Sequence, residues 1–324
     1  MIAIEQNVSA THVTLEFVIY YMEAPDMRSA GDLLERTLDR RDELDEGIDL
    51  PWSKMHGYFW LRKGELVLLG GYTGHFKSTI TSQIGCYAMR HGSKVGVCSL
   101  ELKAEDVIEQ FAEISSTTHR PPVRYMENWC AWADDKLVVY DRLDAIEPHD
   151  AIRMAIKFAQ LGCDLVILDC LMMMGVCDDL EREREFVQTL VRVAKKFGVT
   201  VLLVHHMKKP QGQDGEHSSP GKYMFNGTSH ISNTPDSIVI VWHDKQQAAL
   251  RAKVEDMGVP DQAYDPDRRD MLFTVHKQRN GKYEGSIALW QAKKSRAFVA
   301  RQDRKIQAFD PPEAWPVAKV GNDG

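Results

Sequence analysis

The strongest chemical signal in this sequence is a stretch that directly follows the apolar run 66–69. Its residues are Gly71, Tyr72, Thr73, Gly74, His75, Phe76, Lys77, Ser78 and Thr79. In the pattern G-x-x-x-x-G-K-[ST], backbone N–H groups at a strand-to-helix turn surround phosphates, the lysine reaches them and the hydroxyl binds Mg²⁺. Gly71, Lys77 and Ser78 fit this pattern, but Phe76 replaces its second glycine. The stretch predicts a nucleotide phosphate site with an altered pocket, in which Gly74 supplies flexibility.

Two carboxylates follow later apolar runs. Glu101 comes after the run 94–100, and Asp169 comes directly after 165–168. Ligands of parallel α/β sheets bind outside the carboxyl ends of the strands, so both acids are predicted to face the nucleotide. Glu101 would orient or deprotonate an attacking water, and Asp169 would join Ser78 at Mg²⁺. The alternative interpretation of Glu101 is the solvated start of a helix.

Two adjacent histidines, His205 and His206, end the apolar run 201–204. Neighbouring residues of a strand point to opposite faces, so the pair is poorly placed to share a metal ion. We expect one of them to donate a hydrogen bond to the γ-phosphate of the nucleotide. The other is then a hydrogen-bonded structural histidine.

A later run ends in Lys277, Gln278, Arg279, Asn280 and Gly281. Asn-Gly is a strong signal for a tight turn. Lys277 and Arg279 are two residues apart and would lie side by side near that turn. They are either a solvated strand edge or a pair of cations that stabilises phosphate charge, as an arginine finger supplied by a neighbouring subunit does.

These residues must be positioned by alternating strands and helices, which begin at residue 47. The apolar runs predict strands over 66–70, 94–100, 137–140, 165–168, 200–204, 237–242 and 271–276. Helical periodicity predicts helices over 78–90, 104–114, 149–161 and 181–197, with a Pro121-Pro122 break after the second. Nearly continuous Val/Ile/Leu strands between helices indicate an α/β fold with a mainly parallel central sheet that helices cover on both faces.

The chain is predicted to divide into three parts. Residues 1–46 form a short N-terminal arm whose segment 29–46 is an amphipathic helix capped by Ser29. This helix packs on its own domain or docks on a neighbouring subunit, and both interpretations stay open. Residues 47–300 form the α/β domain, and residues 301–324 form a C-terminal tail.

Composition sets the class of protein. The chain has 324 residues, of which 44% are hydrophobic and 27% charged, and this is typical of a globular protein. A formal net charge of −7 argues against coating nucleic acid by bulk electrostatics, but permits a local basic loop in an oligomer. The N-terminus lacks the features of a secretory signal, and no apolar run approaches the roughly 18–20 residues of a membrane span. We therefore expect a cytoplasmic protein without a membrane partner and with reduced cysteines: Cys86, Cys98, Cys130, Cys163, Cys170 and Cys177.

The motifs, in this order, resemble the RecA-like motor of DnaB-type replicative helicases. They are the phosphate loop, Ser-Leu-Glu101, Ile-Leu-Asp169, a strand ending in His-His206-Met-Lys-Lys, and Lys277-Gln-Arg-Asn-Gly. The segment 202–209 looks closest to the phage and mitochondrial primase-helicase branch. The resemblance covers roughly residues 47–296, and five short motifs in the correct order make it specific. It implies a RecA-like P-loop NTPase fold.

The resemblance also implies roles for individual residues. Lys77 would hold the phosphates of ATP, Ser78 and Asp169 the Mg²⁺, and Glu101 would be the catalytic carboxylate. His206 would sense the γ-phosphate. Lys277 and Arg279 would reach the nucleotide of the neighbouring subunit. In this family the loop after His206 lines a central channel, so the DNA-contact candidates are Lys208, Lys209 and Lys222.

The implied activity is a hexameric, ATP-driven helicase that translocates on single-stranded DNA in replication. Its expected partners are single-stranded DNA, further copies of this chain and a separate primase or loader. No zinc-ribbon or primase-like region precedes the motor, so the fused primase of the family is expected to be absent. The segment 225–229 also lacks an arginine that often precedes the corresponding glycine in relatives. Two alternatives stay open: a RecA-like DNA-binding ATPase without unwinding, such as a recombination mediator or loader, and a nucleotide-dependent assembly protein with weak catalysis.

Overall fold

The computed structural model describes residues 29–43, 46–176, 179–208, 217–227 and 229–306. The chain divides into two compact units, Met1–Asp45 and Glu46–Gly324. Among the described residues, no helix combines the length and the apolar character that crossing a membrane requires.

The described part of the first unit contains one helix, α2 (Leu34–Glu43). Before it, Ser29 and Asp32 exchange hydrogen bonds, since Asp32 N donates to Ser29 Oγ and Ser29 N donates to Asp32 Oδ2. The helix begins five residues later than the predicted cap position. Leu34 and Leu38 are exposed on it, so its apolar stripe is available for packing.

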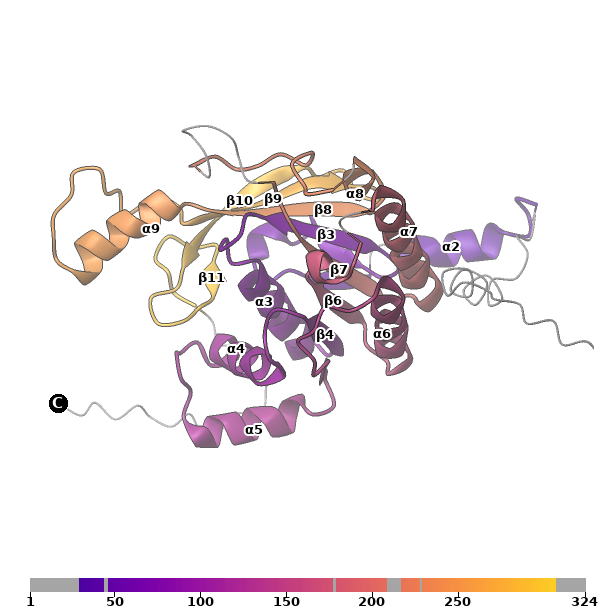
Figure 1. The fold of residues 1–324 in the computed structure, drawn as a ribbon, viewed down its shortest axis with the longest axis horizontal. Helices are drawn as coiled ribbons and strands as arrows, with labels where there is room; N and C mark the ends of the chain where they lie inside the picture. The colour runs from indigo at the N-terminus through magenta and orange to yellow at the C-terminus, as the bar shows by residue number, and fades with distance from the viewer. Residues whose placement is uncertain (1–28, 44–45, 177–178, 209–216, 228, 307–324) are drawn as a thin grey trace, which may run out of the picture. The chain divides into compact units, whose positions relative to one another are not determined.

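A single large sheet forms the centre of the second unit (Figure 1). Its strand order is β11-β10-β9-β8-β3-β7-β6-β4-β5. The neighbours β8, β3, β7, β6, β4 and β5 run parallel, whereas β9, β10 and β11 extend the sheet as antiparallel strands. The parallel strands are β3 (Leu66–Gly71), β4 (Val95–Ser99), β5 (Leu137–Val139), β6 (Leu165–Asp169), β7 (Thr200–His206) and β8 (Ser237–His243). The antiparallel strands are β9 (Met271–Gln278), β10 (Gly285–Gln291) and β11 (Phe298–Val299).

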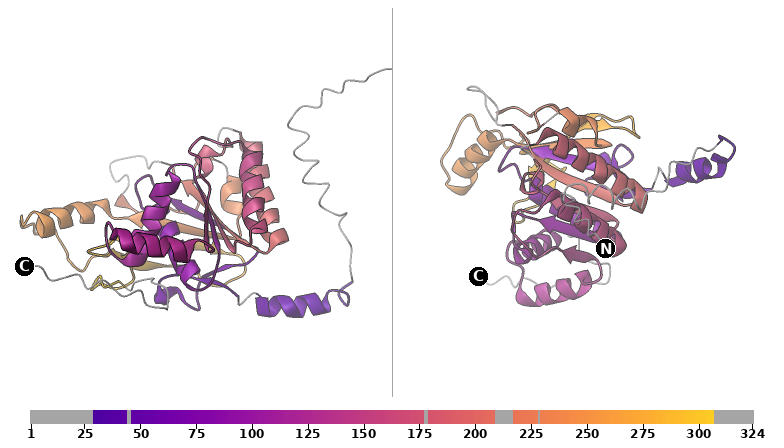
Figure 2. Two further views of the ribbon diagram at one scale, coloured as in Figure 1. Left: turned by 90° about the horizontal axis from the view of Figure 1, so that it is seen from below. Right: turned by 45° about the vertical axis from the view of Figure 1, so that its right-hand side comes forward.

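Helices cover both faces of this sheet, as Figure 2 shows from two further directions. Alternate residues of β3 enter different cores: Val67 and Leu69 pack with one set of helices, Leu66 and Leu68 with another. The first set is α3 (Lys77–Arg90), α4 (Ala104–Ser116) and α5 (Val123–Ala133), and the second is α6 (Pro148–Gln160) and α7 (Leu180–Phe197). Burial on both faces explains the uninterrupted apolar strands. The predicted fold class is confirmed.

Several short elements are absent from the sequence-based prediction. They are β1 (Gly47–Asp49), β2 (Trp60–Arg62), α5, α8 (Ser229–Asn233), α9 (Lys245–Arg251) with its π-helical extension Ala252–Asp256, β10 and β11. The Pro-Pro break marks the start of α5, because Pro122 is its N-cap residue. Strand β11 has two residues and is anchored from outside, where Trp52 Nε1 and Gln83 Nε2 donate to the carbonyl of Phe298. Such tertiary support leaves no local pattern in the sequence.

Candidate nucleotide site

The phosphate loop connects β3 to α3 and has little room for extra atoms. A Cβ on Gly71 would lie 2.8 Å from the carbonyl oxygen of Val241, so the close approach of β8 requires glycine there. Gly74 has φ +77°, a conformation that side chains rarely adopt. His75 is fully buried, and its Nδ1 accepts a hydrogen bond from His243 N at 3.0 Å. The loop is therefore held by its neighbours before any ligand arrives.

Phe76 takes the left-handed conformation that glycine usually provides, with φ 59° and ψ 27°. For a residue with a side chain this costs about 1–2 kcal/mol. Its ring packs edge-on against His243, at 4.8 Å between centroids, and against Phe298 at 5.2 Å. These contacts with the end of β8 and with β11 thus offset the backbone strain. This placement accounts for how an aromatic residue fits into the loop.

The sheet register brings the later motifs to the loop. His206 pairs with Gly71 across β7 and β3, and Asp169 pairs with Ser99 across β6 and β4. Glu101 follows Ser99 by two residues. The carboxyl ends of four neighbouring strands thus meet at one edge, as the strand-end argument predicts.

Three of these side chains form a continuous chain of hydrogen bonds. Lys77 Nζ lies 3.0 Å from the carbonyl of Tyr72 and 3.2 Å from His206 Nδ1. His206 Nε2 lies 3.2 Å from Glu101 Oε1. An ammonium group can only donate, so Nδ1 accepts and Nε2 carries the proton that faces the carboxylate. His206 therefore links the lysine of the phosphate loop to Glu101.

The hydrogen bonds and charges around Glu101 keep its carboxylate charged. The hydrogen bond from His206 is the largest cause that lowers the pKa of Glu101, to about 2, with help from Cys170 and the charge of Lys77. Burial lowers the pKa of Lys77, and the nearby acids Asp169 and Glu101 oppose that effect. Glu101 is thus an ionised but weakly basic group while His206 holds it.

Ser78 and Asp169 provide oxygen atoms suited to Mg²⁺. Ser78 Oγ donates to Asp169 Oδ2 at 2.5 Å, and a small cleft beside the pair is lined in part by Ser99. Asp169 is 3% exposed, and its Oδ1 has no hydrogen-bond partner among the described residues. Burial raises the pKa of Asp169, opposed by the hydrogen bond from Ser78. A buried carboxylate oxygen without a partner, beside a hydroxyl, fits a hard cation.

The two adjacent histidines have different surroundings, as the strand alternation predicts. His205 Nε2 lies 2.7 Å from the carbonyl of Asn226, and its ring stacks on Phe225. Burial lowers the pKa of His205 to about 4, so it is neutral at physiological pH. His205 is thus the structural member of the pair.

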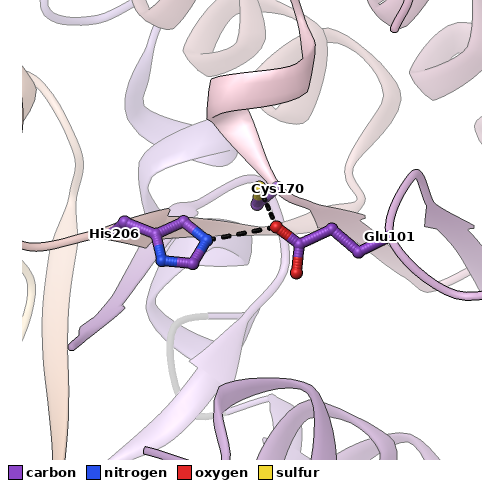
Figure 3. Close-up of side chains that lie close together, drawn as sticks. All are labelled: Glu101, Cys170 and His206. Carbon is purple, nitrogen blue, oxygen red and sulfur yellow. Dashed lines mark hydrogen bonds and ion pairs between the residues drawn. The ribbon is translucent and has the colours of Figure 1, made fainter. Parts of the chain in front are cut away.

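Cys170 is a site residue that the sequence analysis did not identify. Figure 3 shows a carboxylate oxygen of Glu101 joined to both Cys170 and His206, and Cys170 Sγ lies 3.0 Å from Glu101 Oε1. The thiol is fully buried. Its only sequence signal is its position directly after Asp169, which is too weak to indicate a role.

Lys277 and Arg279 lie where the parallel strands begin, which is the opposite edge of the sheet from the phosphate loop. Strand β9 is antiparallel to β8, so Gln278 pairs with Ser237, which begins β8. Asp236 in turn bonds Leu66, the first residue of β3. The six residues of β3, about 20 Å of strand, separate this point from the loop. The two cations therefore cannot reach the phosphate site of their own chain.

At this edge the cations are anchored to the segment before β8. Lys277 Nζ donates to the carbonyls of Asn233 and Pro235, both at 2.7 Å. Burial and the nearby Arg279 lower the pKa of Lys277 to about 8. Arg279 Nη1 lies 3.1 Å from Asp236 Oδ1. The two cations lie side by side, as their spacing predicts.

The Asn-Gly signal does mark a turn, but Asn280 also has a tertiary role. Gly281 N donates to the carbonyl of Gln278 within the turn between β9 and β10. Asn280 Nδ2 donates to Glu65 Oε1 at 2.7 Å. Glu65 is buried, and burial raises its pKa. The turn is therefore tied to the start of β3.

Comparison with known proteins identifies the family of this chain. The family model described as "AAA domain" matches residues 35–212, more than half of the chain. The chain belongs to this AAA domain family. The DNA helicase/primase of Enterobacteria phage T3 is 23% identical to it over 207 residues, covering 57% of this chain and 36% of the phage protein. The chain thus matches about a third of the length of that curated relative.

Two solved structures share the fold of this AAA domain. The first, described as an ATPase domain, superposes with a TM-score of 0.67 at 13% identity, covering 85% of this chain and 99% of that one. The second is a DnaB-like replicative helicase, whose structure was described together with its interactions with primase. It gives a TM-score of 0.60 at 12% identity, with 88% of this chain and 70% of that one covered. The resemblance to DnaB-type RecA-like helicases drawn from the motifs is confirmed.

The predicted DNA-contact residues of this AAA domain lie after β7. Lys208 is exposed, and its N–H donates to the carbonyl of Met224. Lys222 is half-buried, and its Nζ lies 5.7 Å from the ring of Tyr223. Lys209 lies outside the described residues. Tyr223, next to Lys222, is 72% exposed, a feature that no sequence pattern indicated.

Proposed function

We propose that this chain is the ATP-hydrolysing motor domain of a replicative DNA helicase that works as a hexameric ring on single-stranded DNA. The observation that carries the proposal is the hydrogen-bonded chain from Lys77 through His206 to Glu101. It connects the phosphate loop to a carboxylate placed to act on water. The similarity to a phage helicase/primase supports the DNA-related part of the proposal.

Nucleotide binding rests on the loop 71–79 and its lysine. Backbone N–H groups at the start of α3 would hold the phosphates of ATP, helped by the helix dipole. Lys77 would exchange the carbonyl of Tyr72 for the β- and γ-phosphates. Ser78 and Asp169 would hold Mg²⁺, which neutralises phosphate charge when bound.

Hydrolysis couples Glu101 to the state of the γ-phosphate through His206. While His206 donates to Glu101, the pKa of that carboxylate is about 2 and it is a weak base. A γ-phosphate that accepts the Nε2 proton of His206 would release Glu101 and raise its basicity. Glu101 could then orient and deprotonate the attacking water. His206 thus acts as a positioning residue for the general base.

The remaining phosphate charge is stabilised by a neighbouring subunit. Lys277 and Arg279 lie about 20 Å of strand away from their own loop, which supports a role at the nucleotide of another chain. An arginine supplied in trans stabilises charge in the transition state of phosphoryl transfer. Hydrolysis at subunit interfaces requires an oligomer, and a closed ring presents each edge to the next subunit.

DNA binding is assigned to the segment after His206. Lys208, Lys209 and Lys222 would contact the phosphate backbone, and exposed Tyr223 would stack on a base. Six copies in a ring supply enough positive charge despite the acidic total. A separate primase or loader is the expected protein partner, in line with the described interactions of the DnaB-like helicase with primase.

The test combines light scattering with ATPase and fork-unwinding assays on the full chain. We expect a ring-sized oligomer, ATPase stimulated by single-stranded DNA, and unwinding of a forked duplex. Lys77→Ala should abolish hydrolysis and unwinding, whereas Lys63→Ala, which changes an exposed lysine, should not. A monomer indifferent to DNA would refute the proposal. DNA-stimulated ATPase without unwinding would favour a recombination mediator or loader instead.

A further inference from the structure

Three side chains with metal-binding atoms converge at the nucleotide site: Glu101, Cys170 and His206 (Figure 3). One ligand atom from each lies within 4.8 Å of the others. A thiol sulfur, an imidazole nitrogen and a carboxylate oxygen form a donor set that suits Zn²⁺ or Co²⁺, whereas Mg²⁺ prefers oxygen ligands. We propose that these residues form a site for a zinc-class divalent cation, and that the bound ion stops nucleotide hydrolysis.

The spacing of the three groups suits such an ion. In a tetrahedral zinc site with bonds of about 2.0–2.3 Å, ligand atoms lie about 3.3–3.8 Å from one another. Here Oε1 of Glu101 is 3.0 Å from Cys170 Sγ and 3.2 Å from His206 Nε2. Small side-chain movements, without a change of backbone, would open this spacing. Three protein ligands also leave a fourth position for water.

The three ligands come from separate strands and differ in exposure. Cys170 follows β6 and is fully buried, and His206 ends β7 with 9% exposed. The side chain of Glu101, after β4, is 42% exposed. An ion would therefore enter from the side of Glu101. Because β4, β6 and β7 are neighbours in the sheet, the ligands lie at or just after the ends of adjacent strands.

Metal binding requires two proton movements. The thiol of Cys170 loses its proton to solvent as the sulfur–metal bond forms. On His206 the proton leaves Nε2, and Nδ1 must become protonated if the ring stays neutral. Thr73 Oγ1, at 3.3 Å from Nδ1, can accept that hydrogen bond once Lys77 moves away. The ion thus breaks the hydrogen-bonded chain from Lys77 to Glu101.

The inhibitory effect rests on the function proposed above for Glu101 and His206. An ion bound to both would prevent Glu101 from acting on water and His206 from contacting the γ-phosphate. The oxygen pair of Ser78 and Asp169 shares none of these ligands, so Mg²⁺ and the zinc-class ion occupy different positions. Excess Mg²⁺ should therefore fail to reverse the inhibition.

The binding site itself is tested without nucleotide. The full chain is titrated with Co²⁺, and the absorption from thiolate-to-cobalt charge transfer is followed. We expect this band to appear, to disappear when Zn²⁺ displaces Co²⁺, and to persist in Cys130→Ser, which changes an exposed thiol. Cys170→Ser should abolish the band. A wild-type chain without the band, or a folded Cys170→Ser variant that keeps it, would overturn the proposal.

Two further arms keep the test decisive. If Cys170→Ser does not fold, His206→Asn serves instead: it should keep the thiolate band but weaken Co²⁺ binding at least about tenfold. Unchanged Co²⁺ affinity in that variant would also overturn the site.

In the ATPase arm, Zn²⁺ added with excess Mg²⁺ should inhibit the wild-type chain, and uninhibited hydrolysis at saturating Zn²⁺ would refute the regulatory role. A chain that binds Co²⁺ as expected but never hydrolyses ATP would retain the metal site and lose the proposed function.

Discussion

The parallel sheet has one edge where its strands end and an opposite edge where they begin. These two edges differ in how much of the candidate nucleotide site one chain provides. At the carboxyl edge, Lys77, Glu101 and His206 already form a connected array beside the phosphate loop. At the opposite edge, Lys277 and Arg279 donate to backbone carbonyls and to Asp236. The first edge carries the phosphate loop. The second carries two cations and, among the described residues, no such loop. In the proposed mechanism these are two complementary halves of one site, which two subunits join.

The largest expected effect comes from removing a cation at the second edge. Arg279→Ala should lower the maximal ATPase rate by about 10³-fold, because an arginine finger supplies transition-state charge stabilisation of that order. Nucleotide affinity should stay nearly unchanged, since the binding loop is at the other edge. Steady-state kinetics and nucleotide titration measure the two quantities. Lys282→Ala, at an exposed cation of the same turn, is the matched control. An equal loss of affinity in the Arg279 variant would mean that the edges are not separate.

The anchor of that edge can be weakened through Asp236. This carboxylate is 1% exposed, accepts from Leu66 N at 3.1 Å and pairs with Arg279. Asp236→Ala leaves a buried N–H without its acceptor and should lower the free energy of unfolding by about 2–3 kcal/mol. Asp236→Asn keeps an acceptor oxygen and should cost less. Urea denaturation compares the three proteins, and equal stability of all three would contradict the anchoring role.

The first edge should show a distinct pH dependence through buried His205. Its pKa is about 4 in the folded chain, against the ordinary value of 6.5. As the pH falls, His205 binds a proton in the unfolded chain before it does so in the folded chain, and this lowers the free energy of unfolding. The full free energy of unfolding is therefore present above about pH 6.5, and this contribution is lost towards pH 4. Between pH 8 and pH 5 the loss is about 2 kcal/mol. His205→Gln should remove that part of the pH dependence, as measured by denaturation at both pH values. An unchanged pH profile would show that His205 does not cause it.

The smallest effect concerns Phe76 in the phosphate loop. Phe76→Ala removes the ring contacts with His243 and Phe298 but keeps a Cβ in the left-handed conformation. Phe76→Gly removes the same contacts and also relieves the strain. The glycine variant should therefore be more stable than the alanine variant by about 1 kcal/mol. Thermal denaturation decides the order, and a more stable alanine variant would refute the strain.

The first edge could be predicted from sequence because each of its parts has a local signal. Glu101, Asp169 and His206 each follow an apolar run, and parallel strands bring such ends together. The roles of Cys170, Asp236 and Glu65 could not be predicted. Their importance comes from partners 43 to 215 residues away, such as Asp236 with Arg279 and Glu65 with Asn280. Only the register of the sheet reveals those pairs.

Phe76 illustrates the same limit within the strongest motif. The sequence shows phenylalanine in place of glycine and predicts an altered pocket, but it does not predict where the ring of Phe76 lies. Its partners lie at the end of β8 and in the two-residue strand β11. Strand β11 depends on distant hydrogen bonds from Trp52 and Gln83, so no local pattern predicts it. Packing across the sheet decides how the substitution is accommodated.

The central claim is that one chain's phosphate loop works with another chain's Arg279. Its most direct test mixes Lys77→Ala subunits with Arg279→Ala subunits under conditions of subunit exchange. Interfaces then form that combine the intact loop of an Arg279→Ala subunit with the intact arginine of a Lys77→Ala subunit. The account predicts ATPase activity well above that of either variant alone. Confirmed exchange with no recovery of activity would contradict it.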